Sequence, residues 1–293
     1  MLRRLLRLLP TLLLIPAVAA AEAPKPLLWK VSDGDNAVYL LGSFHLLQPT
    51  DYPLAESTDA AFADAERVVF EISPEEANSP ALSIGFQQAA LREDGKRLED
   101  TLPPALWQRL QAHVVARGGN PAVLQNYDAW AVGLTLSLTE MQRLGLDPSH
   151  GLDRHFMQRA ATAGKPTGGL ETAAQQVALF EEMTPEQQIA ALEDALGEAA
   201  ELRERIAQMH ALWRAGDADG LAAATLDELR RDHPQLYARM NRDRNQAWLP
   251  VVQAMLDDSD TDDTLLVVGS MHLLGDDGLV ELLRARGYRV ERL

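Results

Sequence analysis

Two histidines stand in near-identical eight-residue segments at opposite ends of the chain. Residues 40–47 read Leu-Leu-Gly-Ser-Phe-His-Leu-Leu and residues 267–274 read Val-Val-Gly-Ser-Met-His-Leu-Leu, so His45 and His272 share one context. Neutral imidazole is the commonest metal ligand, and histidine titrates closest to neutral pH. If both segments end neighbouring strands, both rings emerge at one sheet edge, where they can share a metal ion or a substrate. The alternative is two half-buried histidines that bond to backbone groups at similar turns.

Two glutamates also follow apolar runs that read as strands. Glu71 follows Val-Val-Phe, and Glu171 ends the run 165–170. His45 and His272 would hold a divalent metal ion with open positions, with Glu71 as third ligand or as a catalytic general base. Such a set without cysteine suits zinc, manganese or cobalt. Glu171 could be a ligand or a general base. The alternatives are that Glu71 caps the following turn and that Glu171 is a charge favoured at a helix N-terminus.

A basic cluster at 241–245 supplies further polar candidates. Its arginines and asparagines suit recognition of a carboxylate or a polarised carbonyl, and we assign Arg244 and Asn245 to substrate binding, with Arg244 also catalytic. The alternative is a solvated helix face. Ser43 and Ser270 lack the second glycine of a nucleophile elbow, so we expect them to bond to the backbone at the turns and to line the substrate site.

The elements around both motifs predict a repeated strand–helix–strand unit. The N-terminal unit is predicted as a hairpin of 27–32 and 37–41, a helix at 53–65 and a strand at 67–72. The C-terminal unit is predicted as a strand at 264–268, a helix at 277–286 and a strand at 288–292. Such units favour parallel pairing with right-handed crossovers. The predicted fold is therefore α/β, with a central mixed sheet built from two repeat halves.

The region between the two units is predicted to be mostly helical. Thr184 and Gln187 form a capping-box pattern around Pro185, which predicts a helix start there. The predicted helices are 103–117, 121–144, 152–163, 184 to about 215 and about 232–257, with a short strand at 165–170.

Composition and the N-terminus limit the class of protein. Arg3, Arg4 and Arg7 precede a short apolar run and an alanine-rich segment, so we predict a signal peptide at 1–21 and a single domain at 22–293. We expect a periplasmic or secreted protein with no membrane contact after signal removal; a retained N-terminal anchor is the alternative. The net charge of −16 disfavours nucleic acid. The sequence predicts no oligomeric state.

These motifs together resemble the TraB/PrgY/GumN family, which includes the TIKI-type proteases, and the exported GumN-like bacterial members above all. The resemblance rests on five segments in the family's order, which span nearly all of the chain. They are residues 40–47, residues 68–72 with Glu71, residues 151–175 from Gly151-Leu152-Asp153 to Gly169-Leu170-Glu171-Thr172 and Gln175, the pair Arg244-Asn245, and residues 267–275. The chain lacks the His-Glu-x-x-His signature of zinc proteases.

The resemblance implies an α/β fold related to the erythromycin esterase and ChaN-like group, with a site built from both histidines and the acidic residues. For TIKI-like members it implies metal-dependent peptide hydrolysis. Our first hypothesis is therefore an exported, metal-dependent hydrolase that acts on a peptide or small-molecule substrate. The rival is a non-catalytic periplasmic binder of a peptide or a small ligand such as haem. A scaffold role in envelope polysaccharide assembly is a third hypothesis, and it leaves both histidines without a task.

Overall fold

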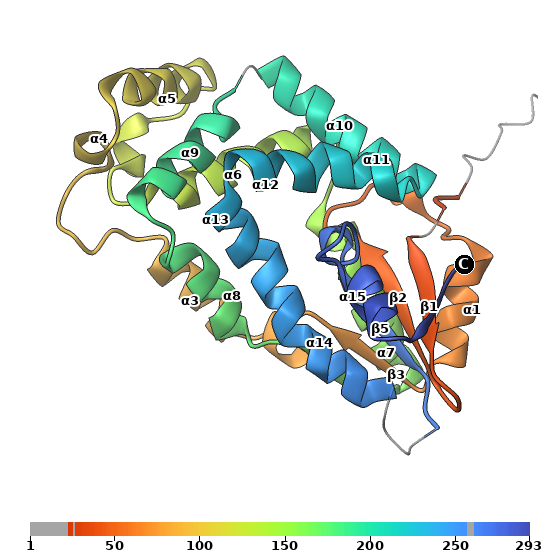
Figure 1. Ribbon diagram of the computed structural model, residues 1–293. Coiled ribbons are helices and arrows are strands. Elements are labelled where there is room, and N and C mark those ends of the chain that lie inside the picture. The colour runs from red at the N-terminus through yellow and green to blue at the C-terminus, as the bar shows by residue number, and fades with distance from the viewer. Residues whose placement is uncertain (1–22, 26, 198, 257–260) are drawn as a thin grey trace, which may run out of the picture.

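A six-stranded sheet lies at the centre of the computed structural model, which describes residues 23–25, 27–197, 199–256 and 261–293 (Figure 1). The strands are β1 (Leu28–Ser32), β2 (Ala37–Ser43), β3 (Arg67–Phe70), β4 (Thr167–Gly169), β5 (Thr264–Gly269) and β6 (Arg289–Arg292). Their order is β4-β3-β5-β2-β1-β6. Strands β2, β3, β4 and β5 are parallel, whereas β1 is antiparallel to both β2 and β6. The prediction of an α/β fold with a central mixed sheet is confirmed.

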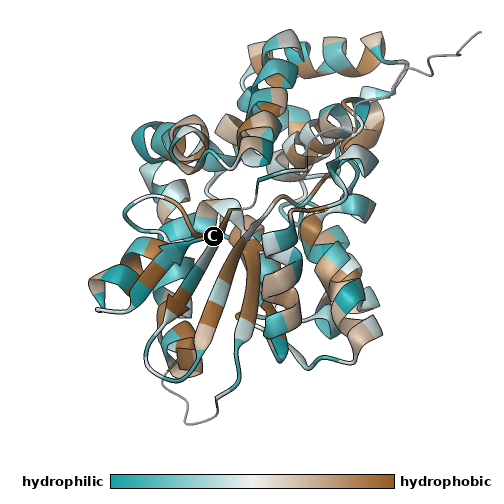
Figure 2. Cartoon of the chain, turned by 90° about the vertical axis from the view of Figure 1, so that its right-hand side faces the viewer, coloured by the Kyte–Doolittle hydropathy of each residue, from teal (hydrophilic) through white to brown (hydrophobic). Residues whose placement is uncertain are grey.

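The two strands that carry the histidine motifs form the buried middle of the sheet. Every residue of β2 and β5 is buried, as expected for nearly continuous apolar strands that are covered on both faces. Phe62 of α1 (Glu56–Asp64) packs on Phe156 of α7 (Leu152–Ala163), and α14 (Asp243–Leu256) contacts α15 (Leu279–Ala285). Figure 2 shows the central strands as hydrophobic and much of the helical exterior as hydrophilic.

The chain leaves β2 and β5 in opposite directions across the sheet. From β2 it passes through α1 to β3, which pairs with β5 on one side, and from β5 it passes through α15 to β6 on the far edge. Right-handed crossovers in opposite directions place their helices on opposite faces, and Figure 1 shows α1 and α15 flanking the strands. The predicted hairpin, both helices and the three strands of these units are confirmed, with ends that shift by a few residues.

The region between β3 and β5 is mostly helical, as predicted. Its remaining helices are α2 (Pro74–Ala77), α3 (Pro80–Ala89), α4 (Leu98–Thr101), α5 (Pro104–Ala116), α6 (Ala129–Arg143), α8 (Ala173–Glu181), α9 (Pro185–Ala195), α10 (Ala199–Ala215), α11 (Ala218–Ala222), α12 (Glu228–Asp232) and α13 (Pro234–Tyr237). Short 3₁₀ turns lie at η1 (Pro49–Asp51), η2 (Pro121–Leu124), η3 (Pro148–His150) and η6 (Ser270–His272), and π-helical turns at η4 (Ala223–Asp227) and η5 (Ala238–Arg242). Helices α4, α5, α6 and α9 share a second apolar cluster, separate from the core around the sheet.

The prediction of one helix over 121–144 was wrong. Residues 121–124 form η2, and α6 begins only at Ala129. The backbone between them bonds to an earlier segment instead of to itself, because Leu98 N–H donates to Gln125 O and Asp128 N–H donates to Ala90 O. Hydrogen bonds to a distant segment therefore replace helical ones here. The helical spacing of apolar residues in the sequence does not predict such bonds.

Two other predicted helices are interrupted. The capping box at Thr184 is confirmed, but α9 ends at Ala195 and α10 starts at Ala199, with Gly197 between them. Glycine in a helix interior costs about 1 kcal/mol relative to alanine. The predicted helix 232–257 instead starts at Pro234, whose missing N–H ends the preceding helix, and it contains the π-helical turn η5. Such turns often occur at functional sites.

The predicted signal peptide at 1–21 lies outside the described residues, and a single domain at 22–293 stays a prediction. Within the described part of the chain, no helix is long and apolar enough to span a membrane.

Candidate functional site

Both motif histidines lie at the same edge of the sheet. Strands β2 and β5 are parallel neighbours, and Ser43 pairs with Gly269, so the second motif lies one residue further along than the first. The first motif therefore stays in strand geometry through Ser43, whereas the second turns into η6 at Ser270. The two histidines also differ in solvent exposure: the His45 side chain is 58% exposed, whereas the His272 side chain is only 7% exposed.

The His45 ring is held from one side by a carboxylate. Its Nδ1 lies 2.7 Å from Oδ2 of Asp153, and the Ser43 hydroxyl donates to Asp153 Oδ1 at 2.8 Å. The Asp153 charge raises the pKa of His45 to about 9. Among the described residues, Nε2 of His45 has no hydrogen-bond partner, so the ring presents this nitrogen to the site.

Local backbone packing explains why Asp153 reaches His45. Helix α7 begins against the first motif, where Leu152 N–H donates to Phe44 O. A Cβ on Gly151 would lie 2.1 Å from the carbonyl oxygen of His45, so a side chain there is excluded. Asp153 stands in the first turn of α7, where a carboxylate also interacts favourably with the helix dipole.

His272 is fixed in one tautomer by two buried asparagines. Its Nδ1 lies 2.6 Å from Asn245 Oδ1, while Asn245 Nδ2 donates to Asp277 O and to Asn241 Oδ1. Asn245 thus turns its oxygen toward the ring, which places the proton on Nδ1 and the lone pair on Nε2. Burial lowers the pKa of His272 to about 3, so the ring is neutral at neutral pH.

Arg244 ties the two predicted carboxylates to His272. Its Nη2 donates to Glu71 at 2.6 Å and to Glu171 at 2.5 Å, Nε donates to Glu171 at 3.2 Å, and Nη1 lies 2.9 Å from His272 Nε2. The guanidinium also stacks over Trp248, with 4.7 Å from Cζ to the ring centroid. Each of the three charged side chains is at most 12% exposed. The site therefore contains a buried, charge-paired triad.

Glu71 is ionised despite its burial. Burial alone would raise the pKa of Glu71, but attraction to His272, Arg244 and His45, together with the amide of Gly269, lowers it to about 2. Because His272 is neutral at neutral pH, we assign the larger share of this effect to Arg244, whose charge is permanent. Glu71 Oε1 accepts the Gly269 N–H at 2.8 Å, and Oε2 accepts from Gln176 at 3.2 Å.

The three predicted ligand side chains meet at Gly269. A Cβ on this glycine would lie 3.1 Å from Glu71 Oε1, 3.3 Å from His45 Nε2 and 3.6 Å from His272 Cδ2. The missing side chain thus leaves a space bordered by both imidazoles and the carboxylate. As the side chains stand, no group of three or more His, Cys, Asp or Glu among the described residues is close enough to hold a metal ion. The Arg244 guanidinium supplies positive charge there instead.

The donor set nevertheless fits a divalent cation in its chemistry. Nitrogen and carboxylate oxygen are the ligands of zinc and related metals. Each imidazole is anchored through Nδ1 to an oxygen and turns Nε2 inward, as metal-binding histidines usually do.

The remaining predicted residues fall into two groups. The Ser270 hydroxyl donates to the backbone oxygen of Ser43, as expected, whereas the Ser43 hydroxyl donates to the side chain of Asp153 and not to the backbone. Arg244 and Asn245 point into the site rather than to solvent. Sequence reasoning gave Asp153 no role in the site, although Gly151-Leu152-Asp153 belongs to the segments that carry the family resemblance. It also missed Gln176 and Trp248, which no sequence pattern marks.

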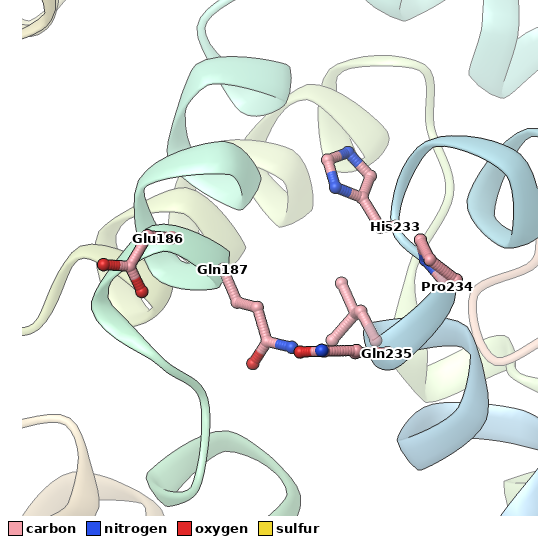
Figure 3. A pocket seen from close by; sticks show the side chains of 6 residues that line it. Glu186, Gln187, His233, Pro234 and Gln235 are labelled. Carbon is pink, nitrogen blue, oxygen red and sulfur yellow. The ribbon is translucent and has the colours of Figure 1, made fainter.

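A pocket of about 230 Å³ adjoins the site. Its lining residues are His45, Phe70, Glu71, Ile72, Ala77, Asn78, Pro148, Asp153, Arg154, Met157 and Gln176. A separate hollow contains His233 near the start of α13 and is lined by Glu186, Gln187, His233, Pro234, Gln235 and Leu236 (Figure 3). None of the predicted site residues lines this second hollow, so it is a different place on the molecule.

Comparison with known proteins places this chain in a family. The chain is 24% identical over 251 residues to the uncharacterized protein YbaP of Escherichia coli (strain K12), covering 86% of this chain and 89% of YbaP. It is 24% identical over 315 residues to Metalloprotease TIKI1 of Danio rerio, covering 90% of this chain and 62% of TIKI1. For Metalloprotease TIKI2 of the same fish, 24% identity over 303 residues covers 86% and 58%. No solved structure matches. Because the TraB/PrgY/gumN family profile matches residues 27–292, the chain belongs to the TraB/PrgY/gumN family.

Proposed function

We propose that this chain is an exported, metal-dependent hydrolase that acts on peptides. The observation that carries the proposal is the pairing of His45 and His272 at the ends of neighbouring strands, each held through Nδ1 by an oxygen, with His45 Nε2 beside Gly269 and His272 Nε2 3.9 Å from Glu71 Oε1. Two relatives named metalloproteases, TIKI1 and TIKI2 of Danio rerio, support the reaction class. The N-terminal signal pattern supports export.

His45, His272 and Glu71 are the residues that would hold the cation. When bound, zinc, manganese or cobalt supplies Lewis-acid polarisation of a substrate carbonyl. Their donor atoms have the right chemistry for such an ion, and the space above Gly269 is bordered by all three side chains.

The protein side chains prepare the site for a reaction at a carbonyl. Asp153 and Asn245 fix the two rings, so that neither has to reorient. Glu71 is ionised and can accept a proton, while the permanent charge of Arg244 can stabilise a developing oxyanion. Glu171 uses both oxygens to hold Arg244, so in this proposal it is a positioning residue.

The test combines metal analysis with peptide cleavage. The purified protein and the His45→Ala and His272→Ala variants are loaded in turn with zinc, manganese and cobalt, and metal content and cleavage of a mixed peptide pool are measured. His233→Ala is the matched control, because this histidine also lies near a carboxylate, 4.0 Å from Asp194, but outside the site.

The expected result is one tightly bound metal ion and cleavage in the unmodified protein and in His233→Ala, with both lost in His45→Ala and His272→Ala. Circular dichroism checks that these variants remain folded. Metal content or cleavage that persists in His45→Ala and His272→Ala contradicts the proposal.

A further inference from the structure

We propose that the pocket beside His45 and Glu71 binds one large apolar side chain of the substrate, at a position next to the bond that is cleaved. The inference rests on the proposed function, which it deepens by naming the substrate class. The pocket shares His45 and Glu71 with the candidate site, so a group seated in it lies directly beside the reacting atoms.

The walls of the pocket are largely apolar and come from three elements. Phe70 and Ile72, at the end of β3, are 1% and 8% exposed, and they form a side fixed by the core. Ala77 of α2 and the half-buried Met157 of α7 complete the apolar lining. An apolar surface of this kind gains free energy when a side chain displaces its water.

Nε2 of His45 has no hydrogen-bond partner among the described residues, but the other ring nitrogen and both carboxylates of the pocket have partners. His45 and Asp153 bond to each other, and Glu71 accepts from Arg244, Gly269 and Gln176. Water in the pocket therefore finds few groups that still need a hydrogen bond, and it is held weakly. Its displacement favours the binding of an apolar ligand. Arg154, Asn78 and Pro148 are exposed and belong to the rim.

The volume limits what the pocket can hold. At about 230 Å³ it is smaller than the roughly 300–1,000 Å³ of small-molecule sites, so it does not enclose a whole drug-sized ligand. A cavity of about 150 Å³ holds benzene. The pocket therefore has room for one phenyl or large aliphatic group, and we expect phenylalanine, leucine or methionine to be preferred there over glycine.

A binding experiment tests the pocket without catalysis. The methyl carbons of methionine are labelled with carbon-13, the Met157 signal is assigned with Met157→Leu, and N-acetyl-phenylalanine amide or N-acetyl-glycine amide is added. The phenylalanine compound should shift the Met157 signal and the glycine compound should not. Ala77→Phe fills the pocket from a different element, α2, and should abolish the shift. Equal shifts with both compounds, or no shift, overturn the proposal.

Cleavage of a peptide library provides the second readout. The unmodified protein should cleave peptides with phenylalanine next to the scissile bond at least about tenfold faster than those with glycine, since even one methylene in an apolar pocket is worth about 10–200-fold. Met157→Trp and Ala77→Phe should remove this preference, and the volume-conserving Met157→Leu should keep it. An unchanged preference in both filled variants overturns the pocket proposal. Binding without any cleavage refutes the proposed hydrolase but supports the pocket.

Discussion

Replacing Arg244 with methionine should destabilise the protein strongly, because it leaves two carboxylates buried without a cation. Glu71 and Glu171 are 10% and 7% exposed, and both bond to the Arg244 guanidinium. Methionine is similar in length and preserves the apolar contact with Trp248, so the change removes mainly charge and hydrogen bonds.

The expected magnitude follows from the burial of the triad. Removing one partner of a buried ion pair costs about 3–5 kcal/mol, because the remaining charge is left uncompensated. With a shift of about 2–4 °C per kcal/mol, the midpoint of thermal unfolding should fall by roughly 6–20 °C at pH 7. Arg242→Met is the control: Arg242 pairs with Asp243 at the exposed surface, where an ion pair contributes about 0–1 kcal/mol.

The pH dependence separates this explanation from a simple packing defect. In the unmodified protein the pKa of Glu71 is about 2, so its stabilising contribution is fully present above the ordinary carboxyl pKa and is lost progressively as the pH falls from there through 2. Without Arg244, burial should raise the pKa of Glu71 above its ordinary value. The protonated carboxyl then favours the folded state, and the cost of the substitution should shrink as the pH falls from 7 to about 4.

The assay is urea unfolding of the unmodified protein, Arg244→Met and Arg242→Met at pH 7 and at about pH 4.5. A loss below about 1 kcal/mol at pH 7 would refute the claim that the triad is buried and ion-paired. A loss that stays the same at both pH values would refute the role of the carboxylate charges.

Three further predictions concern the surroundings of the site and the fold. Gly269→Ala keeps a permitted backbone with φ −51° and ψ 136°, but its Cβ crowds Glu71 and His45 by a few tenths of an ångström. Cleavage should therefore fall by about tenfold, with little change in stability. Gly168→Ala is the control: its Cβ would have no contact closer than 3.9 Å, so it should change neither cleavage nor stability. Asp153→Asn should bring the pKa of His45 down from about 9 toward 6.5 in an NMR titration. Asp51 is fully buried, and burial alone would raise its pKa, but hydrogen bonds from His210, the Gln48 amide and Arg214 lower it. Asp51→Asn should therefore reduce the stability of the protein above about pH 4. Thermal unfolding of both proteins should show this difference disappear as the pH falls below about 4.

The sheet and the meeting of the two histidines could be predicted because they depend on patterns that are local in sequence. The apolar runs before Gly42 and Gly269 are long enough to mark buried strands, and their shared motif indicated a common edge. The helix start at Thr184 was visible for the same reason, since all parts of a capping box lie within four residues.

The details that sequence reasoning missed depend on contacts between distant segments. The break before α6 arises from bonds between residues 125–128 and residues 90–98, which no helical pattern reports. The role of Asp153 depends on how α7 docks on the first motif through Gly151. The bonds from Arg244 to Glu71 and Glu171 span 173 and 73 residues, so the pairing of these charges emerges only from the fold.

The central claim is that His45 and His272 share one metal ion. The most direct measurement is X-ray absorption spectroscopy of the cobalt-loaded protein, which counts the imidazole ligands of the metal. The account predicts two imidazole ligands in the unmodified protein and in His233→Ala, and loss of the bound cobalt in His45→Ala and His272→Ala. A cobalt ion with fewer than two imidazole ligands in the unmodified protein, or cobalt that stays bound in either variant, would contradict it.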